Sequence, residues 1–130
     1  MEIEKEEEKK IVLIIEDEVP ILEALVDKLE REGFKTLQAK DGKEGIALAD
    51  AHHPDMIILD VLMPVMDGIA FMKQIREEKN SWGKKVPIMV LTNLGGEQKS
   101  QLDKYKPAFY ITKTSLSMND VANKIKAKIS

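Results

Sequence analysis

Acidic residues stand directly after two aliphatic runs of this sequence. The run IVLII (11–15) leads into the acidic triplet EDE (16–18), and the run MIIL (56–59) is followed at once by Asp60. Continuous aliphatic runs of this length are typical of strands that are buried on both faces of a parallel sheet. The carboxyl ends of parallel strands meet at one edge of the sheet, and the working crevice of open α/β sheets lies there.

We therefore expect Glu16, Asp17 and Asp60 to share one crevice, in which their like charges repel. Unit charges about 4 Å apart interact by roughly 4 kcal/mol when the effective dielectric constant is about 20. Protonation, a bound cation or a nearby lysine would offset this repulsion. Carboxylate oxygens suit Mg²⁺, and the absence of a histidine or cysteine close to these positions argues against zinc. The sequence therefore predicts a Mg²⁺ site.

Two further residues at strand ends would complete a site for phosphoryl chemistry. Thr92 ends the run PIMVLT (87–92), and Lys113 follows the run AFYIT (108–112). A carboxylate can attack phosphorus and hold the phosphoryl group as an acyl phosphate. Mg²⁺ and a lysine would neutralise charge on the transferring group, and a hydroxyl would donate to its third oxygen. Asp60, Mg²⁺, Lys113 and Thr92 supply these roles.

Helical patterns alternate with the strands, including the more alternating run FKTLQA (34–39), which suits an edge strand. The expected helices begin at Pro20 and stop near Gly33, cover 43–52, follow a cap at Asp67, run from about Glu97 to Tyr105, and follow a capping-box-like start at Ser117 and Asp120. The longest stretch expected to be irregular runs from Glu78 to Pro87. Five strand–helix units predict an α/β fold with a parallel sheet and helices on both faces.

Length and composition fit one domain of 130 residues with an aliphatic core, since 43% of the residues are apolar and 5% aromatic. No apolar run approaches the roughly 20 residues that span a bilayer, and no signal peptide precedes the first strand. The absence of cysteine fits an intracellular protein. Most of the net charge of −3 lies in the leader MEIEKEEEKK, so the rest of the chain offers no basic face for nucleic acid. We expect residues 1–9 to be a flexible leader and 10–130 the domain.

Taken together, the motifs resemble those of a known signalling family. LIIEDE, PDMIILDVLMPVMDG, PIMVLT and FYITK occur in this order, and the sequence from Lys10 to Ile129 resembles the receiver domain of two-component response regulators, chemotaxis regulators among them. The most specific segment contains Asp60, Pro64, Asp67 and Gly68. The resemblance implies a flavodoxin-like, doubly wound sheet of five parallel strands in the order 2-1-3-4-5.

The resemblance also assigns roles to the acids. Asp60 would be the phosphoacceptor, and Asp17 and Asp60 would bind Mg²⁺ directly. Glu16 would bind the ion directly or through water. The backbone carbonyl of Leu62 would complete the ligands that the protein supplies.

The remaining implied roles concern the phosphoryl group and the switch. Lys113 would pair with the phosphoryl group, Thr92 would swing toward it, and Tyr110 would change rotamer. The donor would be a histidine kinase or a histidine phosphotransfer protein, as in a phosphorelay. The resemblance thus implies a cytoplasmic, self-catalysed phosphoacceptor and not a turnover enzyme. Phosphorylation would change the surface around the last two strands and helices, and the sequence does not identify the downstream target.

The sequence departs from the family pattern in three respects. Thr114 follows Lys113 where the family usually has proline, often after a cis bond; a cis bond before a residue other than proline costs about 3–4 kcal/mol, so a trans bond that displaces Lys113 is one expectation. Asn93 stands after the switch hydroxyl where a small residue is usual, and it would crowd the phosphoryl group or donate to it. Leu62 and Leu94 are apolar where the family orients the attacking water. We therefore predict slow hydrolysis of the acyl phosphate; a half-life of seconds in Mg²⁺ would contradict this.

Other functions remain open. Thr114 and Asn93 leave room for a degenerate receiver that binds partners without phosphorylation. A phosphatase or phosphotransferase would commonly place two acids two residues apart after the first strand, and a nucleotide or flavin site would require a glycine-rich turn there. The triplet EDE matches neither pattern. The sequence ends at Ser130, soon after the last helix, and fits either a stand-alone receiver or a piece of a longer protein.

Overall fold

A computed structural model describes residues 9–61, 66–77, 81–93 and 96–129. Its five parallel strands form one sheet in the order β2-β1-β3-β4-β5, which confirms the expected order. The strands are β1 (Ile11–Ile15), β2 (Lys35–Ala39), β3 (Met56–Asp60), β4 (Ile88–Thr92) and β5 (Phe109–Thr112). Since β2 lies on one side of β1 and all later strands lie on the other, the strand order reverses between β1 and β3. A crevice forms beyond the carboxyl ends of the strands at such a point.

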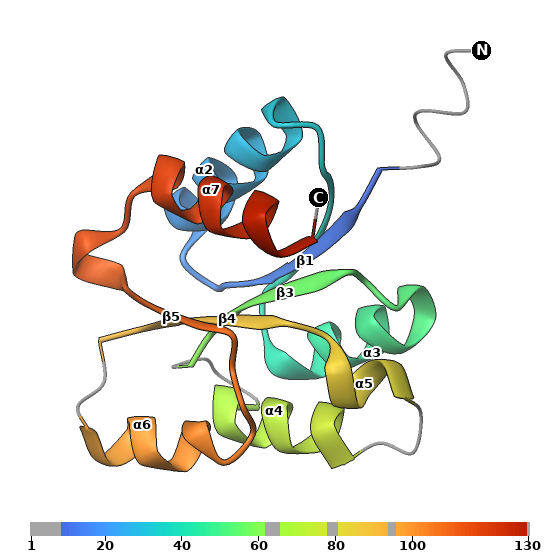
Figure 1. Ribbon diagram of the computed structural model, residues 1–130, viewed down its shortest axis with the longest axis vertical. Coiled ribbons are helices and arrows are strands. Elements are labelled where there is room, and N and C mark those ends of the chain that lie inside the picture. Colours follow the sequence, from blue (N-terminus) through green and yellow to red (C-terminus); the bar gives the residue numbers. More distant parts are fainter. Residues whose placement is uncertain (1–8, 62–65, 78–80, 94–95, 130) are drawn as a thin grey trace.

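Helices cover both faces of the sheet (Figure 1). On one face lie α2 (Val19–Arg31) and α7 (Met118–Ile129). On the other lie α3 (Gly42–His52), α4 (Gly68–Glu77), α5 (Ser81–Lys85) and α6 (Gly96–Asp103). A short 3-10 turn, η1 (Lys113–Ser115), connects β5 to α7. None of the described helices has the length and apolar character that crossing a membrane requires.

The central strands are buried on both faces, which explains their continuous aliphatic sequences. Along β1, Leu13 and Ile15 belong to the core beneath α3 and α4, whereas Val12 and Ile14 belong to the core beneath α2 and α7. Successive side chains of a strand point to opposite faces, so each core receives every second residue. Fully burying one such side chain contributes roughly 1.5–3 kcal/mol. The well-packed core therefore fixes the positions of the carboxyl ends of β1 and β3.

The expected caps are present where helices begin. Asp67 Oδ1 accepts a hydrogen bond of 2.8 Å from the backbone N–H of Ala70 at the start of α4. Ser117 Oγ accepts one of 3.2 Å from the N–H of Asp120 in α7. Asp41, which follows β2, caps α3 in the same way. These hydrogen bonds satisfy donors that have no partner within their own helix.

One expectation about secondary structure was wrong. The stretch from Glu78 to Pro87 was expected to be irregular, but α5 lies within it. Trp82 holds this short helix against the preceding chain, because its Nε1 donates a 2.7 Å hydrogen bond to the carbonyl of Pro54 and its ring stacks on His53 at 4.7 Å. These are tertiary contacts, which the local sequence does not reveal.

Candidate functional site

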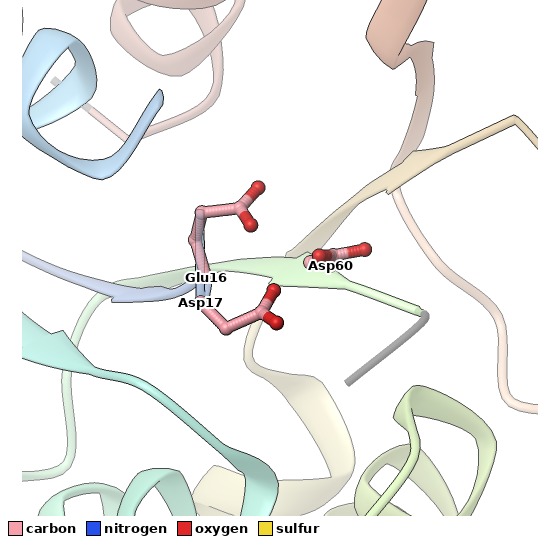
Figure 2. A group of neighbouring side chains, drawn as sticks. All are labelled: Glu16, Asp17 and Asp60. Carbon is pink, nitrogen blue, oxygen red and sulfur yellow. The ribbon is translucent and has the colours of Figure 1, made fainter. Parts of the chain in front are cut away.

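The three expected acids meet beyond the carboxyl ends of β1 and β3. Glu16 and Asp17 follow β1 directly, and Asp60 is the last residue of β3. One carboxylate oxygen from each residue lies within 4.8 Å of the other two. Figure 2 shows the three side chains grouped around one space at the ends of two neighbouring strands. The structure thus brings together the acids that were expected to meet.

Glu16 is a fully buried side chain that lines this crevice. Its backbone N–H donates to the carbonyl of Ala39 at 3.0 Å, which continues the pairing of β1 with β2 and fixes the direction of the side chain. The N–H of Glu18 donates to Glu16 Oε2 at 2.9 Å. Glu16 Oε1 is buried and accepts no hydrogen bond from any described residue, although Lys113 Nζ lies 3.3 Å away as its ion-pair partner. A buried carboxylate oxygen without an aligned donor can still take a ligand.

The protonation of Glu16 reflects this environment. The pKa of Glu16 is raised to about 7, mainly by burial and also by the nearby Asp60, whereas the N–H of Glu18 and the charge of Lys113 act in the opposite direction. Desolvation and a neighbouring carboxylate both disfavour the charged form. A cation in the crevice would favour the charged form again. The side chain is therefore placed to exchange a proton for a metal ion near neutral pH.

Lys113 reaches the crevice from the end of β5. Its Nζ lies 3.1 Å from Asp60 Oδ2 and 3.3 Å from Glu16 Oε1, and it also pairs with the carboxylate of Glu18. Burial lowers the pKa of Lys113, but hydrogen bonds to Glu18 and Asp60 and the charge of Glu16 outweigh this, so the pKa lies above its ordinary value. Lys113 is thus a fixed positive charge beside the predicted phosphoacceptor.

The donor set of the crevice fits a hard divalent cation. All three acids offer carboxylate oxygens, and two of them, Glu16 and Asp60, are buried. Asp17 is exposed. The crowding of these three acids beside Lys113 leaves room for more positive charge. Mg²⁺ prefers such oxygen ligands and keeps several of its waters.

Thr92 and Tyr110 line a cavity of about 550 Å³ beside the crevice. Thr92 ends β4, and its register partner on β5 is Thr112. Leu91, the residue before Thr92, pairs with Asp60, so Thr92 stands at the same edge of the sheet as Asp60. The other lining residues are Asn93, Lys99, Leu102, Thr112 and Thr114.

Tyr110 is held against α6 at the outer side of this cavity. Its hydroxyl donates to the carboxylate of Asp103 and lies 3.3 Å from the carbonyl of Lys99, whose Nζ lies 5.1 Å from the ring centroid. Burial and the hydrogen bond to Asp103 raise the pKa of Tyr110, so the phenol keeps its proton at neutral pH. The ring and Thr92 therefore line the same cavity.

The structure leaves some expectations open and answers others. Leu62 and Leu94 lie outside the described residues, so the carbonyl ligand and the slow hydrolysis stay predictions. No cis peptide bond occurs among the described residues, so Lys113 and Thr114 are joined by a trans bond, and Lys113 still reaches Asp60. Glu18, the last acid of the triplet EDE, pairs with Lys113. Sequence reasoning missed that partner, since 95 positions separate the two residues.

Comparisons with known proteins agree with this geometry. The sequence profile of the response regulator receiver domain matches residues 12–126. The chain belongs to the response regulator receiver family. Receiver domains of this family serve two-component signalling, and their fold is the one described above. The acidic group of Glu16, Asp17 and Asp60 fits a Mg²⁺ site within it.

Curated relatives and solved structures are similar to most of this chain. The alkaline phosphatase synthesis transcriptional regulatory protein PhoP of Bacillus subtilis is 40% identical over 83 residues, which are 64% of this chain and 33% of PhoP. The chain spans about a third of the length of the curated relatives it matches. Among solved structures, the chemotaxis protein CheY4 of Vibrio cholerae has a TM-score of 0.84 at 28% identity, over 93% of this chain and 99% of CheY4.

A second solved structure bears on the crevice. The receiver domain of the sensor histidine kinase PA1611 from Pseudomonas aeruginosa has a TM-score of 0.78 at 25% identity, over 92% of this chain and 97% of that one. In that protein a magnesium ion is coordinated in the active site cleft.

Proposed function

We propose that this receiver is a Mg²⁺-dependent phosphoacceptor switch that takes a phosphoryl group on Asp60 from a histidine kinase or a histidine phosphotransfer protein. The observation that carries the proposal is the setting of Asp60. This buried carboxylate lies beside two further acids within 4.8 Å and beside Lys113 Nζ at 3.1 Å. The proposed donor class is consistent with the family, and with the kinase from which the PA1611 receiver comes.

The side chains have separate roles in the proposed transfer. A carboxylate oxygen of Asp60 attacks the phosphorus atom of a phosphohistidine, so that an O–P bond forms while the P–N bond breaks and the released imidazole takes up a proton. Lys113 pairs with a phosphoryl oxygen, and the Thr92 hydroxyl donates to another.

The acids beside Asp60 would hold the metal ion. Asp17 and Asp60 would bind Mg²⁺ directly, Glu16 directly or through water, and the Leu62 carbonyl would complete the protein ligands. When bound, Mg²⁺ neutralises charge on the phosphoryl oxygens.

The proposed output is a change of surface. Rotation of Thr92 toward the phosphoryl group would empty part of the shared cavity, and Tyr110 would leave Asp103 to fill it. The surface around β4, β5, α6 and α7 would then differ between the two states. We further propose that the chain acts in the cytoplasm, with residues 1–9 as a leader and 10–130 as the domain.

The decisive experiment is an intact-mass measurement after incubation with Mg²⁺ and acetyl phosphate or phosphoramidate. We expect one phosphoryl adduct that needs Mg²⁺ and is absent from Asp60→Asn. Circular dichroism of the variant checks that it folds. A folded wild-type protein that binds Mg²⁺ but takes no phosphoryl group would overturn the proposal and favour a receiver that acts without phosphorylation.

A further inference from the structure

The residue that carries the positive charge of the crevice sits at the start of a short turn. Lys113 is the first residue of η1, a 3-10 turn of only three residues. The first N–H groups of any such turn have no partner within it. Thr112, which precedes the turn, provides no side-chain hydrogen bond to these donors. Whatever satisfies them also fixes how the turn presents Lys113.

One of these donors is satisfied from the neighbouring strand. The backbone N–H of Thr114 donates to Asn93 Oδ1 at 3.3 Å. Asn93 directly follows Thr92 at the end of β4, and Thr92 is in register with Thr112 at the end of β5. Asn93 therefore occupies the place of a helix cap, although it comes from another strand and is 21 residues away in sequence.

We propose that Asn93 is a positioning residue, which caps the turn at Thr114 and thereby holds Lys113 toward Asp60. The inference rests on the proposed function, since it concerns how Lys113 is presented for phosphoryl transfer. The proposal also explains two departures from the family pattern, Asn93 and Thr114, by a single hydrogen bond between them. Proline, which receivers usually have after this lysine, has no N–H to donate, so the acceptor at Asn93 has a use because position 114 is threonine.

The size of the effect follows from the contact. Both Asn93 and Thr114 are exposed, and a single hydrogen bond of this kind contributes a modest net free energy. Losing it should slow phosphorylation by roughly two- to tenfold, without abolishing it. Mg²⁺ affinity should change less than about twofold, because Asn93 is not among the residues that would hold the ion. Slower phosphorylation with nearly unchanged Mg²⁺ affinity would distinguish a loss of Lys113 positioning from general damage to the site.

The cap itself can be tested without phosphorylation. Amide hydrogen exchange at Thr114, followed by ¹⁵N NMR in the absence of Mg²⁺, should be several times faster in Asn93→Ala than in the wild-type protein. Asn93→Asp keeps an acceptor at this place and should restore slow exchange. Equal exchange at Thr114 in all three proteins would overturn the inference and leave the proposed function untouched.

The effect on Lys113 is tested by a double-mutant cycle on the rate of phosphorylation by phosphoramidate. Thr114→Pro removes the donor, and Thr114→Ala is the matched control that keeps it and should stay within about twofold of wild type. If Asn93 and Thr114 act as a pair, adding Asn93→Ala to Thr114→Pro should cause little further slowing. Effects of the two substitutions that multiply independently would overturn the inference. Should the proline variant not fold, the rates of Asn93→Ala and Thr114→Ala are compared instead, and only Asn93→Ala should be slow.

A wild-type protein that takes no phosphoryl group would overturn the proposed function and, with it, the catalytic part of this inference. The hydrogen-exchange measurement would still show whether Asn93 caps the turn.

Discussion

Arg76 and Glu16 both carry charge into the protein, at opposite edges of the same sheet, and they are satisfied in different ways. The half-buried guanidinium of Arg76 donates to four main-chain carbonyls that precede β4 and β5. These belong to Val86 at 2.7 Å, Tyr105 at 2.8 Å, Gly83 at 3.1 Å and Lys106 at 3.3 Å. The carboxylate of Glu16 accepts one main-chain hydrogen bond, from the N–H of Glu18, and lies beside Lys113 Nζ, while its Oε1 accepts no hydrogen bond from the described residues.

This difference separates a structural charge from one that is suited to a ligand. The planar fork of an arginine matches several carbonyls at once, so Arg76 ties α4, α5 and the segment before β5 together. Burial lowers the pKa of Arg76, yet a guanidinium stays charged at any physiological pH. Glu16 has acidic neighbours and shares Lys113 with Asp60 and Glu18, so its charge is only partly compensated. The following predictions test this contrast, beginning with the largest effect.

The largest loss of stability is expected from Arg76→Ala. The substitution leaves four carbonyls without their donor, and we expect the free energy of unfolding to fall by about 3–5 kcal/mol. Urea denaturation followed by circular dichroism measures this. Arg31→Ala is the matched control, because Arg31 is 69% exposed and pairs with Asp27 on the surface of α2; its effect should stay within about 0.5 kcal/mol. A loss below about 1 kcal/mol for Arg76→Ala would mean that water replaces the guanidinium easily.

In the absence of metal, Glu16→Gln should raise the free energy of unfolding, whereas Arg76→Ala lowers it. The pKa of Glu16 is about 7 in the folded protein and 4.5 in the reference state, so folding retains a proton that the unfolded chain loses between these values. The stability that this proton provides is complete below about pH 4.5 and is lost as the pH rises toward 7. Glutamine mimics the protonated form, and the variant should be more stable than wild type by about 3 kcal/mol at pH 8, with little difference at pH 4.5.

Urea denaturation in EDTA across this pH range measures the difference between the two proteins. Mg²⁺ should raise the stability of the wild-type protein at pH 8 and affect Glu16→Gln much less, because binding to the folded state alone stabilises it. A difference that does not depend on pH would show that the titration of Glu16 is not its source.

A smaller effect, an increase in Mg²⁺ affinity, is expected from Lys113→Ala. Lys113 supplies positive charge to the same oxygens that a cation would bind, so its removal should tighten Mg²⁺ binding by roughly three- to tenfold at pH 8. Phosphorylation of Asp60 should become slower at the same time. Isothermal titration calorimetry and the intact-mass assay measure the two effects separately. Weaker Mg²⁺ binding would mean that Lys113 organises the carboxylates and does not compete for them.

The sequence predicted what depends on local pattern and on resemblance. Continuous aliphatic runs placed β1 and β3, and the acids at their ends placed the crevice. The strand order came from the family, because no periodicity specifies which strands are neighbours. The contacts of Arg76 were not predictable, since its partners lie 7 to 30 positions away in the chain. Arg76 looks like an ordinary helix-end residue until the carbonyls before β4 and β5 are placed around it.

Two further failures have the same origin. Helix α5 depends on the contact of Trp82 with Pro54, and its own five residues, with a glycine at the centre, carry a weak helical signal. Asn93 was judged by its position next to Thr92, and either crowding of the phosphoryl group or donation to it was expected. Its actual partner, the N–H of Thr114, belongs to another loop. Local patterns indicate which groups need partners, and the tertiary structure determines which partners they receive.

The smallest effect is expected at Glu18, which stands two residues from Glu16 and pairs with the same lysine. Its side chain is 56% exposed, whereas that of Glu16 is fully buried, so water can replace Lys113 as its partner. Glu18→Gln should therefore change the free energy of unfolding by no more than about 0.5 kcal/mol and Mg²⁺ affinity by less than about twofold. Urea denaturation and calorimetry, run beside Glu16→Gln, give the comparison directly. If the two variants behaved alike, burial would not be what separates a charge that requires a ligand from one that solvent already satisfies.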